Sequence, residues 1–236
     1  ELCHLWEIGG GSTHADLLDV PLTEATVKNV TVVIVVDLSN PKDVFPCVTF
    51  WMDRIRTTLR EVETQLRAKP ATAKVMDLLR ERARKNFAED HPNLSGPAKD
   101  LMNLLPINVV IIANKADAFS DKEPKTKKDM SRALRTLAHT NGASLVYSST
   151  KDESPAAMGN LRKMLNQHLF KEAPVETRAT NHNATDFLVV PVGKDFFKDI
   201  EQPDWTPSGK QPAPTTPLDQ WRMAAEDWFK DLDGGD

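Results

Sequence analysis

Residues 107–117 read INVVIIANKAD, an apolar run followed at once by Asn114, Lys115 and Asp117. A short Val- and Ile-rich run without polar alternation is typical of a strand that is covered on both faces. In a doubly wound sheet, ligands sit beyond the carboxyl ends of such strands. An aspartate there can accept two hydrogen bonds from the N1 and 2-amino edge of guanine, while the asparagine and the lysine stem frame the base plane. The stretch therefore predicts a parallel sheet that ends in a guanine-type slot.

Three further apolar runs have the length of strands: Leu2–Ile8, Val30–Val36 and Ser144–Tyr147. Helical segments separate the last three of the four runs, and strands that alternate with helices form parallel sheets. We therefore expect an α/β fold, with a parallel sheet that carries helices on both faces.

Two other stretches resemble parts of the nucleotide site of Ras-like GTPases. Residues 148–151 (SSTK) follow the last parallel strand, where small residues let a backbone N–H reach the base. Residues 6–11 (WEIGGG) resemble the switch motif, with Glu7 in place of the aspartate near magnesium and Gly10 at the γ-phosphate. Gly11 stands where the water-orienting glutamine is usual, which argues against hydrolysis of the usual kind. The predicted nucleotide-binding residues, vestigial or structural, are Asn114, Lys115, Asp117, Ser149, Thr150, Glu7 and Gly10.

The phosphate-binding loop of these proteins is missing from the sequence. No G-x-x-x-x-G-K-[ST] motif occurs in the 236 residues, and that motif supplies the backbone N–H groups and the lysine that hold the phosphates. In a Ras-like sheet the loop follows a central strand beside Leu2–Ile8. We therefore expect an N-terminally incomplete, degenerate GTPase-type domain, whose native polypeptide has further residues upstream. We predict no catalytic residue and no cofactor in this chain, with GTP or GDP as candidate ligands of the full-length protein.

Asn40-Pro41 opens the longest predicted helix, of roughly 28 residues. Its apolar residues, including Leu59 and Leu66, recur in alternating steps of three and four, as in a heptad seam. A helix of about 40 Å overhangs a six-residue strand of ~20 Å. The segment Ala73–Phe87 is expected to fold back on the overhang as a helical hairpin. This seam either packs only within the chain or offers Leu59 and Leu66 to a partner.

Two more helices, at about Thr126–Thr140 and Pro155–Phe170, complete the domain that we assign to residues 1–172. Residues 173–201 form an extension docked on it, with a short edge strand at Phe187–Pro191. Residues 202–217 are a proline-rich linker.

A C-terminal amphipathic helix follows at residues 218–233, with Thr216 as its N-cap. Its apolar stripe docks either on its own domain or on another chain. The partner-binding candidates on that stripe are Leu218, Trp221, Trp228 and Leu232.

Composition excludes several other classes of function. A net charge of −4 favours neither nucleic acid nor an anionic membrane as a partner. Cys3 and Cys47 suit buried thiols in a reducing compartment, and no apolar run approaches the ~20 residues of a membrane helix. The six histidines show no pair at metal-ligand spacing, so no metal site is predicted.

Taken together, residues 5–11 (LWEIGGG), 36–41 (VDLSNP), 134–147 and 148–151 resemble the dynein light intermediate chains, most of all their ciliary, intraflagellar-transport class. The resemblance extends with gaps from Leu5 to about Phe197. It implies a non-motor, non-catalytic subunit that binds and stabilises the tail of the ciliary dynein heavy chain and supports retrograde transport and cilium assembly. It places the protein in the cytoplasm, the cilium or flagellum, the basal body and the cytoskeleton, with transport trains as indirect partners.

Two alternatives remain open at the level of sequence. One is an active GTPase-like switch of the Rab type, which needs an intact upstream phosphate loop. The other is a scaffold that binds GTP without hydrolysing it.

Overall fold

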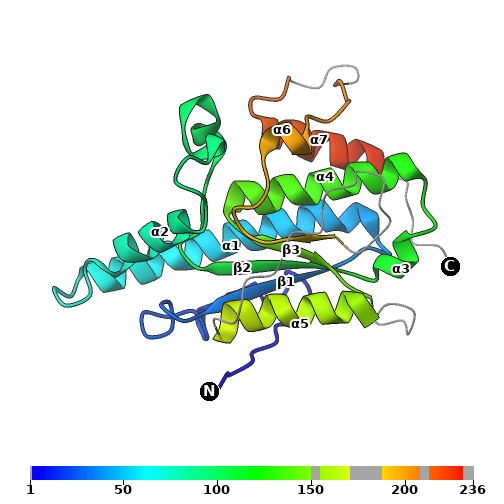
Figure 1. Ribbon diagram of the computed structural model, residues 1–236. Coiled ribbons are helices and arrows are strands. Elements are labelled where there is room, and N and C mark those ends of the chain that lie inside the picture. The colour runs from blue at the N-terminus through cyan, green and yellow to red at the C-terminus, as the bar shows by residue number, and fades with distance from the viewer. Residues whose placement is uncertain (1, 150–154, 171–187, 208–212, 231–236) are drawn as a thin grey trace.

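The computed structural model describes residues 2–149, 155–170, 188–207 and 213–230, and it contains one four-stranded sheet in the order β1-β2-β3-β4 (Figure 1). The strands β1 (Thr31–Asp37), β2 (Asn108–Asn114) and β3 (Ser144–Tyr147) are parallel, and β4 (Val189–Val190) pairs antiparallel with β3. The predicted parallel α/β sheet and the short edge strand are confirmed. In β2 the five residues between Asn108 and Asn114 are buried, as its unbroken apolar run predicts.

Helices cover both faces of the sheet, with α1 (Pro41–Arg67) and α4 (Pro124–Asn141) on one face and α5 (Pro155–Phe170) on the other (Figure 1). The left-handed cap that Asn141-Gly142 predicts is present at Gly142, whose φ is 67°. None of the described helices is both long enough and apolar enough to cross a lipid bilayer. The remaining elements are three short 3₁₀ helices, Ala15–Asp19, Pro92–Leu94 and Gly96–Leu101, and the helices α2 (Val75–Lys85), α3 (Ala116–Phe119), α6 (Phe197–Ile200) and α7 (Pro217–Phe229).

Helix α1 has 27 residues, begins with Pro41 at its first turn, and buries its heptad seam against β1, α4 and α7. Its C-terminal half extends beyond the sheet together with α2 and forms the predicted hairpin (Figure 1). Leu59 and Leu66 on this seam belong to the core and are 4% and 1% exposed.

The prediction of a strand at Leu2–Ile8 is wrong. This segment pairs with no described strand, and Leu2 and Leu5 are 96% and 91% exposed. The apolar pattern measures a tendency to be buried, but a strand also needs a neighbour for its backbone N–H and C=O groups. In the predicted order, one more strand lies between this segment and β1. The described part of the chain has no such strand, so Leu2–Ile8 lacks a partner.

Helix α7 packs on its own domain, against α1 and α4. Its predicted N-cap is confirmed, because the Thr216 hydroxyl accepts a hydrogen bond of 3.0 Å from the Asp219 N–H. The preceding segment is also attached, since the Trp205 indole N–H donates to Asp227 of α7 over 3.1 Å. Trp205, in the proline-rich stretch, therefore contacts the helix that follows it.

The segment from β4 to α6 is held on α4 by a buried ion pair. Arg135 donates two hydrogen bonds to the Asp195 carboxylate, at 2.8 and 2.6 Å, and both side chains are about 5% exposed. Arg132 pairs with Glu201 nearby. Such bidentate contacts fix geometry as well as charge.

Candidate functional site

The carboxyl ends of β1, β2 and β3 meet at one edge of the sheet, where the sequence predicts a guanine-type slot. The backbone register sets Asp37 beside Asn114. The Ser148 N–H donates to the Ala113 carbonyl over 2.9 Å, and its hydroxyl donates to the Asn114 side chain over 3.0 Å. The structure thus brings together the loop after β2 and the loop after β3, although Asn114 and Ser148 are 34 residues apart in sequence.

Lys115 stands at the centre of this edge in a left-handed conformation, with φ of 57°. For a residue other than glycine this conformation is uncommon, and residues in such conformations cluster at functional sites. Its Nζ lies 2.6 Å from Asp37 Oδ2. Burial alone would raise the pKa of Asp37, but hydrogen bonds from Lys115 and from Ser39 lower that pKa below its usual value. The lysine is therefore held against an ionised carboxylate at the end of the neighbouring strand.

Asp117, which would read the guanine edge, lies at the start of α3 and accepts a hydrogen bond of 2.5 Å from the Ser149 hydroxyl. The Ala116 N–H donates to the Ser148 carbonyl over 3.0 Å and ties the two loops together. The carboxylate is thus oriented by its own chain. A base that binds here would share this carboxylate with the Ser149 hydroxyl.

The other predicted nucleotide residues are not brought into this cluster. Across the described residues, no hydrogen bond or ion pair joins Glu7 or Gly10 to Asn114, Lys115 or Asp117. Thr150 lies outside the described residues. Of the predicted nucleotide-binding residues, the structure brings together Asn114, Lys115, Asp117 and Ser149.

Sequence reasoning missed Asp37 as the partner of Lys115, because the two residues are 78 positions apart. A signal existed, since Asp37 ends an apolar run just as Asn114 does. Two polar residues that end parallel neighbouring strands meet at the same edge of a sheet.

The partner-binding candidates on α1 and α7 lie mostly in the core. Trp221 is 1% exposed, and Leu59 and Leu66 are enclosed as described above, so none of the three is accessible in this structure. Leu218 and Trp228 are half-buried beside the core. Leu232 lies outside the described residues. The apolar stripes predicted from the sequence thus serve packing within the domain, because both helices meet each other on the same face of the sheet.

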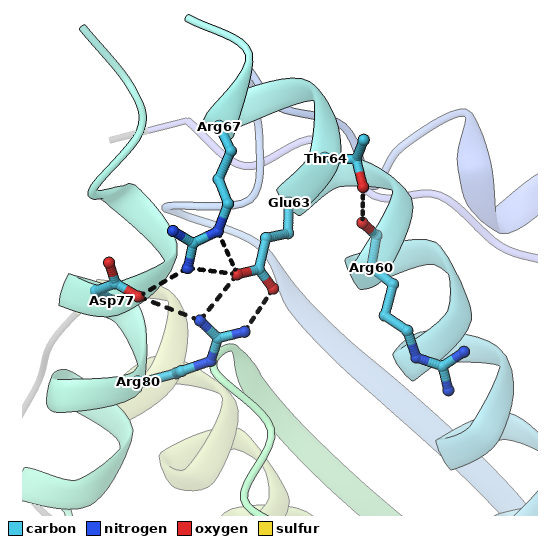
Figure 2. Close-up of polar contacts among 6 residues, drawn as sticks. All are labelled: Arg60, Glu63, Thr64, Arg67, Asp77 and Arg80. Carbon is cyan, nitrogen blue, oxygen red and sulfur yellow. Dashed lines mark hydrogen bonds and ion pairs between the residues drawn. The ribbon is translucent and has the colours of Figure 1, made fainter. Parts of the chain in front are cut away.

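A second polar cluster fixes the α1–α2 hairpin outside the sheet (Figure 2). Glu63 of α1 accepts hydrogen bonds from Arg80 of α2, at 3.0 and 2.5 Å, and from Arg67 Nε at 2.8 Å. Asp77 accepts from both arginines, at 3.1 and 3.3 Å. Hydrogen bonds from Arg80 are the main reason that the pKa of Glu63 is lowered. Two carboxylates and two guanidinium groups therefore clamp the two helices together.

Comparison with known families gives a match over most of the chain. A family model described as dynein light intermediate chain matches residues 1–202. In fold, the chain is similar to a solved structure described as the conserved domain of the dynein light intermediate chain, with a TM-score of 0.60 and 19% identity. That similarity covers 89% of this chain and 77% of the other. At this identity the likeness supports the fold alone.

Among characterised proteins, the chain is similar to those named cytoplasmic dynein 2 light intermediate chain 1. The identity over 231 residues is 30% for the protein from Rattus norvegicus and 29% for those from Bos taurus and Homo sapiens. These matches cover 97% of this chain and 62% of each relative. The chain thus spans about three-fifths of the length of the relatives it matches.

Proposed function

Starting from the fact that this chain belongs to the dynein light intermediate chain family, we propose that it is the light intermediate chain of the second, ciliary cytoplasmic dynein. In this role it is a non-motor subunit that binds and stabilises the tail of the ciliary dynein heavy chain. It thereby supports retrograde intraflagellar transport and cilium assembly. Its locations are the cytoplasm, the basal body, the cilium and the cytoskeleton, and transport trains are indirect partners.

One observation carries this proposal: similarity to dynein 2 light intermediate chain 1 runs through 97% of the chain, in mammals and in Danio rerio. It therefore includes the hairpin, the extension and α7, and not only the strands that any GTPase-like fold shares. A shared fold alone would not carry a function.

The strand-end cluster supports a structural role for any nucleotide. Lys115, which would frame the base, is paired with Asp37, and Asp117 already accepts a hydrogen bond from the Ser149 hydroxyl. Gly11 stands at the position of the water-orienting glutamine, which argues against hydrolysis of the usual kind. We propose that the subunit is not an enzyme, and that GTP or GDP, where the full-length protein binds it, stabilises the fold.

The proposal is tested by co-expressing the full-length protein with the tail of the ciliary heavy chain, and separately with the tail of the other cytoplasmic dynein heavy chain. Co-elution with the ciliary tail is the expected result. Failure to co-elute with it, under conditions where both proteins are folded, contradicts the proposal.

Nucleotide content is tested on the same purified complex by denaturing it and analysing the released bases. Asp117→Asn removes the carboxylate that would accept from guanine, and Asp121→Asn is the matched control on an exposed neighbouring position. We expect any bound GTP or GDP to be lost from the first variant and kept by the second. Steady GTP turnover by the full-length wild-type protein would instead support a Rab-type switch.

A further inference from the structure

We propose that the solvent-facing side of α2, centred on Leu78, docks an acidic helical segment of the partner polypeptide. This inference rests on the proposed function, because it names the part of the surface that meets the heavy chain and the chemistry that this part requires. The α2 face is defined here as Lys74, Leu78, Glu81, Arg82 and Lys85, all exposed.

The α2 face belongs to a rigid projection. The hairpin extends past the sheet (Figure 1), its inner seam is closed by buried residues such as Leu66, Met76 and Leu79, and the Glu63 cluster clamps it from the side (Figure 2). A preorganised surface loses little conformational entropy when it binds. The outer side of the hairpin is therefore suited to binding another polypeptide.

The charge of the hairpin is opposite to that of the rest of the chain. Residues 60–85 contain eight basic and four acidic residues, a net charge of +4, whereas the whole chain carries −4. The remaining residues together therefore carry −8. A basic projection on an acidic body attracts an acidic surface and orients it during encounter.

Several of these cations are not used inside the molecule. Within the described part of the chain, Lys74 and Arg84 form no ion pair, and Arg82 donates only to the Lys28 carbonyl, over 3.0 Å. The acids, in contrast, are largely occupied: Glu63 and Asp77 bind the two clamping arginines, and Glu81 binds Lys85. The excess positive charge is thus directed outward.

The exposure of Leu78 between two cations indicates the kind of partner. Leu78 is 62% exposed, and Lys74 and Arg82 flank it one turn to either side on the same face of the helix. An apolar side chain between two cations matches an amphipathic helix that carries an apolar residue between acids. A phosphate backbone, in contrast, offers no apolar group to pack against the leucine.

The test measures binding of the full-length protein to the ciliary heavy-chain tail, for wild type and two variants. Lys74→Glu/Arg82→Glu reverses the flanking charges, and Leu78→Ala removes the apolar centre. The matched controls on α5 are Arg162→Glu/Lys163→Glu, which makes the same change in net charge, and Leu169→Ala, which trims a leucine that is 39% exposed. Thermal unfolding checks that every variant is folded, as expected for exposed positions.

We expect the charge-reversal variant to bind the tail at least ~10-fold more weakly and with a smaller dependence on salt, and Leu78→Ala to bind about 5-fold more weakly. The α5 variants should bind as wild type does. Tail binding that is unchanged in both α2-face variants overturns this inference and leaves the proposed function standing. No tail binding by the wild type overturns the proposed function itself. Binding of a 20-base-pair RNA duplex that the charge reversal abolishes, with tail binding unaffected, would assign the face to nucleic acid instead.

Discussion

Replacing Trp221 with alanine should destabilise the whole domain, because α7 packs against α1 and α4 and its Trp221 side chain belongs to the core. The Trp221 side chain is 1% exposed, and its ring stacks edge-on against Trp228 at 6.1 Å between centroids. A buried aromatic side chain removes ~150–250 Å² from water, which at about 25 cal/mol per Å² corresponds to about 4–6 kcal/mol. Residual burial in the unfolded chain lowers this upper bound, so we expect a loss of about 3–5 kcal/mol.

The loss is measured by urea denaturation of the 236-residue chain, followed by far-ultraviolet circular dichroism. In a thermal scan, the same change should lower the Tm by about 6–20 °C, at ~2–4 °C per kcal/mol for a chain of this length. Trp6→Ala is the matched control, because Trp6 is 61% exposed and should change the free energy of unfolding by less than about 0.5 kcal/mol. If both variants unfold at the same urea concentration, α7 is not part of the core and the packing described here is wrong.

Three further predictions concern the polar contacts. Asp195→Asn leaves a buried arginine without its anion and should lower the free energy of unfolding by about 3–5 kcal/mol. Glu81→Gln, in an exposed pair, should leave the midpoint of unfolding almost unchanged; similar losses for both variants in denaturant titrations would contradict this. Burial lowers the pKa of His139 from 6.5 to about 4. At pH values between these two, the unfolded chain therefore binds more protons than the folded chain does. Stability should therefore fall by about 2 kcal/mol from pH 7 to pH 5, and His139→Gln should flatten that fall, whereas an unchanged slope would refute the assignment. Glu63→Gln should loosen the hairpin by about 1 kcal/mol and speed hydrogen exchange in α2; unchanged exchange rates would show that the clamp is not needed.

The parallel strands and long helices could be predicted from the sequence to within a few residues. The β2 run has no polar interruption, α1 repeats its apolar residues in steps of three and four, and Gly142 permits the cap that ends α4. These are local signals, and local signals decide element type when they agree with each other.

Contacts between distant segments could not be predicted in the same way. The stripe on α7 has the same spacing whether it docks on its own domain or on another chain, so burial of Trp221 was one of two open alternatives. The pairing of Lys115 with Asp37 depends on which strands are neighbours. The segment Leu2–Ile8 shows the converse, because its pattern is that of a strand although no partner strand adjoins it. In each case the missing information is the identity of the neighbour, which periodicity does not contain.

The proposal that this protein is a subunit of the ciliary dynein is tested most directly by a binding measurement on the purified full-length protein. Its dissociation constant is measured for the tail of the ciliary heavy chain and for the tail of the other cytoplasmic dynein heavy chain, at the same salt concentration. We expect the protein to bind the ciliary tail at least ~10-fold more tightly, a preference of about 1.4 kcal/mol or more. Equal affinity for the two tails, or no binding to the ciliary one, would contradict it.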